Sequence, residues 1–205
     1  MPHASLSLEI TPLSGRFIEL EPYCEAIKAG VREVLDCDSE AWNLFALSGQ
    51  GKHFESWWAR LTGSMAQGHW IAYAIRRKSD SQFLGTTSFI NIRPDRQTVE
   101  IGGTFLSPSA RASYVNPESK LVMLDYAFMR GARRVELLTD SRNSRSQAAI
   151  AKLGATREGV LRRERVTWTG HVRDSVLYSI TDLDWPSVRA RLRERIEPFL
   201  AIEQS

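Results

Sequence analysis

The sequence predicts an α/β or α+β fold, in which helices cover a central sheet of about seven strands. Strand-like and helix-like segments alternate along all 205 residues, with no internal repeat. Three strand-like segments follow one another over 69–106, as in a β-meander. Two strand–helix units come next, at 98–131 and 133–154, and such mixed order places helices against a sheet.

The first third of the chain supplies one strand and two helices. Apolar and polar residues alternate in GRFIELEP at 15–22, which indicates a strand that Pro22 ends. Residues 23–62 read as helices, through AIKAGVREVL and HFESWWARLTG. Trp57 and Trp58 of the second helix are interpreted as packing residues rather than as a site.

Three strands are then expected at 69–77, 83–92 and 98–106, separated by the turns KSDSQ and RPDRQ. Strict alternation along the third strand places two sets of side chains on opposite faces. One face would carry Val99, Ile101, Gly103 and Phe105, and the other Glu100, Gly102, Thr104 and Leu106.

The stretch SARASYVNPESK at 109–120 joins the third of these strands to a helix. Asn116 suits the N-cap and Pro117 the first helical position, while Gly131 suits the residue after the helix. The first N–H groups of such a helix lack partners, and the helix dipole is positive there, so the junction is a candidate anion site.

The rest of the chain continues the pattern. A strand at 133–140 precedes a helix at 143–154, which Asn143 caps and Gly154 ends. A hairpin about Thr169–Gly170 follows, and a helix over 186–200 closes the chain. We expect a single domain over 1–205, with a core at about 13–185.

Composition excludes several classes of protein. The net charge is +3, but acidic residues interleave the basic stretches 162–173 and 189–197, which disfavours a nucleic-acid-binding surface. No apolar run approaches the roughly 18 residues of a membrane span, and no secretory signal is seen, so a cytoplasmic location is expected. Two cysteines and four scattered histidines form no metal-binding spacing, and no metal is expected.

Three segments carry a more specific pattern: VEIGGTFLSPSARASYVNPESKLVMLDYAF, RRVELLTDSRNSRSQAAIAKLGATREGVLRR and RDSVLYSI. They resemble the RimJ/RimL branch of the GNAT acetyltransferases, whose N-x-x-S-x-x-x-h-x-K-x-G helix is matched at Asn143, Ser146, Ile150, Lys152 and Gly154. The resemblance implies a mixed, mostly antiparallel sheet with helices on both faces. It also implies a splayed V between the fourth and fifth strands, here 98–106 and 133–140.

In this family the V holds acetyl-CoA, so the resemblance implies an acetyl-CoA-dependent N-acetyltransferase. The pyrophosphate binds N–H groups of the loop after the fourth strand, and the pantetheine arm pairs with that strand like an added strand. On this alignment the cofactor-binding residues are Phe105, Leu106, Arg111, Ala112, Ser113, Tyr114, Val115, Asn116, Asn143, Ser146 and Lys152.

The loop departs from the family pattern because it contains no glycine. The two family glycines align with Ala112 and Tyr114, and the bulky or basic residue before them aligns with Arg111. Glycine permits close backbone approach and unusual φ. The Tyr114 ring either projects away and leaves the N–H groups intact, or occludes the pyrophosphate. In the second case the chain would be a non-catalytic GNAT-fold binding or interaction protein.

The resemblance also assigns roles in the reaction. Glu100 matches the carboxylate that acts as general base toward the amine, and Ser146 matches the residue that protonates the leaving thiolate. Where RimL-like enzymes have a glutamate on the sixth strand, Arg165 aligns, with Glu164 expected on the other face. An arginine there favours an acidic acceptor. Tyr178 is a candidate acceptor contact, although a core position is the alternative.

The expected partners are therefore acetyl-CoA and an amine acceptor, which is a protein N-terminus or a small-molecule amine. The resemblance also suggests a homodimer, since many relatives are dimers.

Overall fold

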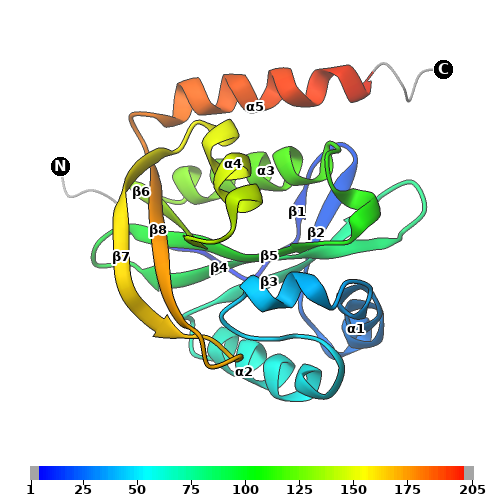
Figure 1. Cartoon of the computed structure of the whole chain (residues 1–205). Helices are drawn as coiled ribbons and strands as arrows, with labels where there is room; N and C mark the ends of the chain where they lie inside the picture. Colours follow the sequence, from blue (N-terminus) through cyan, green and yellow to red (C-terminus); the bar gives the residue numbers. More distant parts are fainter. Residues whose placement is uncertain (1–4, 201–205) are drawn as a thin grey trace.

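The computed structural model describes residues 5–200, and its helices and strands follow the predicted order (Figure 1). The strands are β1 (Leu13–Ser14), β2 (Ile18–Pro22), β3 (Ile71–Arg77), β4 (Phe83–Arg93), β5 (Thr98–Leu106), β6 (Arg134–Asp140), β7 (Thr156–Val166) and β8 (Val172–Thr181). The α-helices are α1 (Lys28–Asp36), α2 (Phe54–Ala66), α3 (Val115–Met129), α4 (Ser144–Leu153) and α5 (Trp185–Leu200).

All the strands join one eight-stranded sheet in the order β1-β2-β3-β4-β5-β6-β8-β7. The sequence predicts about seven, and the additional one is the two-residue β1, which pairs with β2 at the edge. Neighbouring strands are antiparallel except β5 and β6, which run parallel. The mixed, mostly antiparallel sheet is therefore confirmed.

Strands β5 and β6 separate soon after they begin. Their register covers only Thr98 to Glu100 of β5, opposite Arg134 to Glu136 of β6. Beyond this point β5 continues to Leu106 and β6 to Asp140 without pairing to each other. The sheet thus opens as a V at the place that the resemblance implies, and the backbone of 101–106 faces the opening along one edge.

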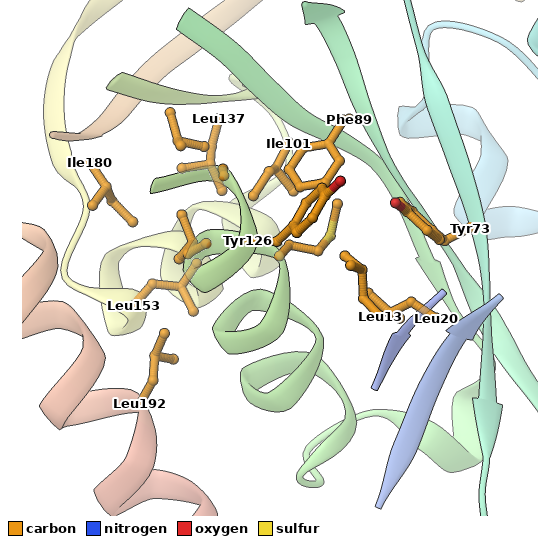
Figure 2. Packing of buried hydrophobic residues seen from close by; sticks show 14 of the residues in the cluster. Leu13, Leu20, Tyr73, Phe89, Ile101, Tyr126, Leu137, Leu153, Ile180 and Leu192 are labelled. Atoms are coloured by element: carbon orange, nitrogen blue, oxygen red, sulfur yellow. The ribbon is translucent and has the colours of Figure 1, made fainter. Parts of the chain in front are cut away.

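Helices cover both faces of the sheet. Figure 1 shows α1 and α2 on one side and α3, α4 and α5 on the other. The larger cluster of buried side chains, here the main core, lies on the α3–α5 side and includes Leu13, Ile101, Leu137, Leu153 and Leu192 (Figure 2). A second core lies under α1 and α2, where Trp57 and Trp58 are buried, as predicted for packing residues.

A bulge in β5 changes which residues share a face. Gly103 has φ of +60°, and the register with β4 shifts at this point. Val99 and Ile101 lie in the main core, but Phe105 lies in the second core, where its ring stacks on Trp42 with centroids 5.1 Å apart. The prediction that Phe105 shares a face with Val99 is wrong, because the bulge inserts a residue and reverses the alternation.

Helix α3 carries an unusual buried cation on the main-core side. The Lys120 side chain is buried, and its Nζ donates to Thr87 Oγ1 at 3.1 Å and Thr104 Oγ1 at 2.6 Å. No carboxylate of the described residues pairs with it. Burial lowers the pKa of Lys120 to about 7, because the charged amine loses its hydration without gaining an opposite charge.

Candidate functional site

The loop between β5 and α3 holds the conformation that glycine would favour at one position. After the 3₁₀ turn Pro108–Ala110, Ala112 adopts φ of +55°, in the left-handed region. Non-glycine residues reach this region at a cost in free energy, because Cβ crowds the backbone. The family glycine aligned with Ala112 therefore has a structural counterpart: the bend is kept although the glycine is replaced.

Tyr114 does not need a glycine conformation. Its φ of −64° and ψ of −20° are ordinary helical values. Its ring contacts Phe17 at 4.7 Å and Phe199 of α5 at 5.5 Å between centroids. The ring therefore packs between the start of β2 and the end of α5, which supports the alternative in which it projects away from the loop N–H groups.

The loop leaves several backbone donors without partners. Val115 N–H donates to Ser113 Oγ at 3.2 Å, and this hydroxyl donates to the Ala110 carbonyl at 2.7 Å. Among the described residues, no hydrogen bond is made by the N–H groups of Ala112 and Ser113. These donors precede the start of α3, so the loop presents the arrangement that binds anions.

Helix α3 begins earlier than the sequence predicts. Val115 is its first residue and Tyr114 its N-cap, so the predictions of Asn116 as N-cap and Pro117 as first helical residue are wrong. Ser113 Oγ satisfies the first N–H group in place of an asparagine side chain. Asn116 instead lies in the first turn, where its N–H group has no intrahelical acceptor.

Arg111 is held at the mouth of the site. Its Nη2 donates to Asp38 Oδ2 at 2.5 Å and its Nε to the Leu106 carbonyl at 3.0 Å. The guanidinium keeps the pKa of Asp38 below its ordinary value. Arg111 and Asp38 line a hollow of about 370 Å³ together with Asn143 and Ser144 of the α4 start. The structure thus brings the predicted loop and the predicted helix to one place.

Asn143 and Ser146 occupy the start of α4. The Asn143 Oδ1 accepts from the Ser146 N–H at 2.9 Å, as an N-cap does. The Asn143 amide nitrogen and the Ser146 hydroxyl make no hydrogen bond within the described chain, so both keep donors for a ligand. Asn143 therefore caps α4, as the sequence predicts, and its side-chain amide nitrogen remains available.

Two predicted site residues lie elsewhere. Lys152 is exposed at the other end of α4, more than two turns from Asn143, so the structure does not bring it to the cofactor segments. Tyr178 is 4% exposed within the main core, opposite Leu137 of β6. This position favours packing for Tyr178 rather than acceptor contact, because its ring faces away from the α1–α2 side.

Glu100 lies on the α1–α2 side, where β5 and β6 begin to separate. The residue is 4% exposed, and Asn91 Nδ2 donates to its Oε2 at 2.7 Å. Burial raises the pKa of Glu100, while the hydrogen bond from Asn91 and the charge of Arg165 oppose that shift. A carboxylate with a raised pKa is suited to accept a proton near neutral pH.

A charged network on β7 and β8 lies on the same face. Arg165 Nη2 donates to Glu164 Oε1 at 2.5 Å, and Ser175 Oγ donates to Glu164 Oε2 at 3.1 Å. Arg173 Nε donates to the same serine oxygen at 2.8 Å. We refer to these four residues, Glu164, Arg165, Arg173 and Ser175, as the β7–β8 network.

The prediction that Glu164 and Arg165 occupy opposite faces is wrong. The register of β7 against β8 runs from Leu161 opposite Ser175 to Arg165 opposite Arg173, so β7 carries extra residues here. Arg163 adopts φ of +51° within this bulge. The bulge turns Glu164 toward the face of Ser175, where it meets Arg165.

Sequence reasoning missed Asn91, Asp38 and Arg173. Asn91 has φ of +52° near the end of β4, and a strand asparagine before a turn gives no signal of a carboxylate partner. Asp38 lies far from Arg111 in the chain. Arg173 stands beside Asp174 near the start of an otherwise uncharged strand, which is a signal that this end of the strand lies near a polar site.

Comparison with known proteins identifies the family. The sequence matches the model of the acetyltransferase (GNAT) domain over residues 20–156. The chain belongs to the GNAT acetyltransferase family. A structure from T. thermophilus assigned as an acetyltransferase is 33% identical, covers 90% of this chain and 96% of that chain, and has a TM-score of 0.80.

Other GNAT structures share the fold at lower identity. A GCN5-related N-acetyltransferase from Brucella melitensis is 21% identical over 91% of this chain and 86% of that chain, with a TM-score of 0.84. Mycobacterium smegmatis RimJ, solved in complex with CoA-disulfide, is 22% identical over 90% of this chain and 92% of that chain, with a TM-score of 0.74. No curated protein matches the sequence significantly.

The family makes this GNAT protein an N-acetyltransferase by class, and GNAT enzymes use acetyl-CoA as acetyl donor. Within residues 5–200, no group of three or more His, Cys, Asp or Glu side chains is placed to hold a metal ion. No helix of this part of the chain is long and apolar enough to cross a membrane.

Proposed function

We propose that the protein transfers the acetyl group of acetyl-CoA to a primary amine, with the donor lying in the V between β5 and β6. The observation that carries this proposal is the loop at 107–114. It keeps a left-handed bend at Ala112 and unpaired N–H groups at Ala112 and Ser113, beside an unpaired edge of β5. The RimJ/RimL branch is part of the proposal, since the chain shares the fold of those enzymes.

The residues present fit the donor on three counts. The N–H groups of Ala112, Ser113 and Asn116 would hold the diphosphate, and the positive end of the α3 dipole adds to their effect. The free edge of 101–106, including the Phe105 and Leu106 backbone, would pair with the pantetheine amides. Asn143, with its free amide nitrogen, lines the same hollow as Arg111 of the loop.

Bound acetyl-CoA would supply the thioester carbonyl carbon that the acceptor amine attacks. As the carbon–nitrogen bond forms and the carbon–sulfur bond breaks, the amine loses one proton and the sulfur gains one. Glu100 Oε1 would take the amine proton directly or through a water molecule, since its Oε2 is held by Asn91. Ser146 Oγ would give a proton to the sulfur from the first turn of α4.

The non-catalytic alternative depends on occlusion of the loop by Tyr114. The contacts of the Tyr114 ring with Phe17 and Phe199 argue against occlusion, because they hold the ring in the packing between β2 and α5. The non-catalytic alternative then requires a loop that keeps its shape but does not bind CoA. A binding measurement tests this directly.

The test is calorimetric titration with acetyl-CoA and with CoA, followed by acetylation of a panel of primary amines. We expect micromolar binding by the wild type and by Ala112→Gly. Ala112→Pro should lose binding while the fold is retained, because proline holds φ at about −65° and cannot adopt the bend. An absence of binding at millimolar acetyl-CoA would overturn the proposed function.

A further inference from the structure

The β7–β8 network places two arginines side by side, and within the described part of the chain one carboxylate, that of Glu164, is bonded to this pair. Arg165 and Arg173 are directly opposed residues of the antiparallel pair β7 and β8. Like charges directly opposite each other destabilise a sheet unless an anion separates them. Glu164 supplies that anion, but both of its oxygens are already used by Arg165 and Ser175.

Arg173 is consequently a buried cation without a direct anionic partner. The residue is 6% exposed, and its one hydrogen bond within the described chain runs from Nε to the Ser175 hydroxyl. Both Nη groups keep their donors. Burial and the charge of Arg165 lower the pKa of Arg173, while Asp140, Glu164 and Glu100 oppose that shift. The two free Nη groups of a buried guanidinium are suited to bind the oxygens of a planar carboxylate.

The other charges near Arg173 are matched in pairs. Asp140 accepts from Arg142 through both oxygens, at 3.0 and 2.8 Å, and Glu164 pairs with Arg165. Among the described charges that act on Arg173, Glu100 is bonded instead to the neutral Asn91, and Arg173 itself is bonded to the neutral Ser175. A zwitterion would complement both, with its ammonium at Glu100 and its carboxylate at Arg173.

We propose that Arg173, supported by Arg165, binds a carboxylate on the acceptor, so that the acceptor is an amine that carries an acid group. This inference rests on the proposed function and narrows its acceptor class. Such an acceptor comes from two sources, either a free amino acid or a polypeptide whose first residue is Asp or Glu. When Glu100 takes the amine proton, the acceptor carboxylate keeps Arg173 compensated.

The experiment compares matched acceptors that differ only in the acid group. A free amino acid is paired with its amide, and an Asp-led peptide with the same peptide led by Asn. We expect wild-type kcat/KM to favour the acid member by about tenfold or more in one of the two pairs, through KM, as for a charge-assisted contact worth about 1.5–3 kcal/mol. A preference for the acid in the amino-acid pair identifies a free amino acid as the acceptor, and a preference in the peptide pair identifies a polypeptide.

Variants then assign the preference to Arg173. Arg173→Met should reduce the ratio of kcat/KM for the acid member to that for the uncharged member to about one, and Arg173→Lys should retain part of the ratio. Ser175→Ala, which removes the oxygen that orients Arg173, covers the case in which Arg173→Met does not fold. Arg157→Met is the matched control, because it removes an exposed arginine charge from the neighbouring strand β7, and its ratio should equal the wild type.

A binding measurement separates this inference from the proposed function. The same acceptor pairs are titrated by calorimetry into the protein with CoA present, without turnover. If the wild type binds acid and uncharged members equally, or if Arg173→Met keeps the preference, the inference is overturned even when amines are acetylated. If CoA binds and no amine is acetylated, the proposed function fails, while a preference lost in Arg173→Met still supports the carboxylate site.

Discussion

Two buried ionisable groups on opposite faces of β5 and its neighbours differ in what surrounds them. Within residues 5–200, the Lys120 amine, on the main-core side, hydrogen-bonds to the hydroxyls of Thr87 and Thr104. Glu100, on the other side, stands beside Asn91 and within the field of Arg165, where β5 and β6 separate. Both have their charged forms disfavoured by burial, but Glu100 has charged neighbours, whereas the groups bonded to the Lys120 amine are neutral.

The difference shows that a shifted pKa alone does not mark a site. Lys120 is a closed position: its side chain is 4% exposed, and the groups bonded to its amine are neutral hydroxyls. Glu100 combines a raised pKa with an opening in the sheet and with charged groups that are only partly matched. Function is assigned by the combination of these features.

The largest expected effect is on catalysis by Glu100. We expect Glu100→Gln to lower kcat by about 10²–10⁴-fold, the contribution of a general base. Asn91 can still donate to the glutamine oxygen, so the local geometry is kept. Steady-state kinetics across pH measure the loss. Glu136→Gln, which changes the neighbouring carboxylate that pairs with Arg134, is the control and should alter kcat little.

The same variant should gain stability. Burial raises the pKa of Glu100, so the folded state holds the proton more tightly than the unfolded chain, and stability is lost as pH rises from about 4.5 through the folded pKa. Glu100→Gln removes that loss, and denaturant unfolding at neutral pH should show a higher free energy of unfolding. A less stable Glu100→Gln with unchanged kcat would assign Glu100 a structural role.

The next effect concerns Lys120, on the closed side. Its pKa falls to about 7 in the folded state, so between there and the ordinary value of 10.5 the unfolded chain binds more protons. Stability should therefore rise with pH across this window and be lowest below it. Lys120→Met should raise the free energy of unfolding at pH 7 by about 1–4 kcal/mol, as when a buried charge is replaced by an apolar side chain.

The measurement is denaturant unfolding of Lys120→Met at several pH values between 6 and about 10, in the window set by the shifted pKa. The Thr87 and Thr104 hydroxyls, 2.9 Å apart, can satisfy each other once the amine is gone. Lys52→Met, at an exposed position, should leave the pH dependence as in the wild type. An unchanged slope in Lys120→Met would mean that the lysine is charged and hydrated in the folded protein.

Periodicity in the sequence predicts the element order, and the family resemblance predicts the V between β5 and β6. The sequence does not predict which face Phe105 or Glu164 occupies. Both errors arise at bulges, near Gly103 and Arg163, where one or more inserted residues reverse a strict alternation. The adjacent glycines of β5 hint at the first bulge, but nothing in the pattern of β7 marks the second.

Long-range polar pairs are equally hidden from the sequence. The contact of Arg111 with Asp38 joins residues from the region before α2 and the loop before α3. Lys120 reads as an ordinary helix lysine, since its burial depends on the threonines that β4 and β5 bring beneath α3. Such contacts depend on packing between elements, which local spacing does not encode.

A smaller effect is expected at Tyr114, beside the loop. Tyr114→Ala removes the ring contacts with Phe17 and Phe199 and should lower the free energy of unfolding by about 1–2 kcal/mol, less than for a fully buried aromatic. The Kd for CoA should stay within about threefold of the wild type, because the ring packs away from the loop donors. A large gain in CoA affinity would show instead that the ring occludes the diphosphate position.

The smallest effect on stability is expected at Ala112, where the backbone is strained. Ala112 holds φ of +55°, so Ala112→Gly relieves a strain of about 1–2 kcal/mol but adds flexibility to the unfolded chain, and a net gain of about 0.5–1 kcal/mol in unfolding free energy is expected. Ala110→Gly, two residues earlier in a buried 3₁₀ turn, has no such strain to lose and should destabilise the protein. We expect Ala112→Gly to raise the unfolding free energy and to keep CoA binding, and Ala110→Gly to lower the unfolding free energy. This result would establish that the loop holds a strained bend of the kind that glycine favours. If both variants are less stable than the wild type, the backbone at Ala112 is not strained. Alanine in place of the family glycine would then cost the fold no stability.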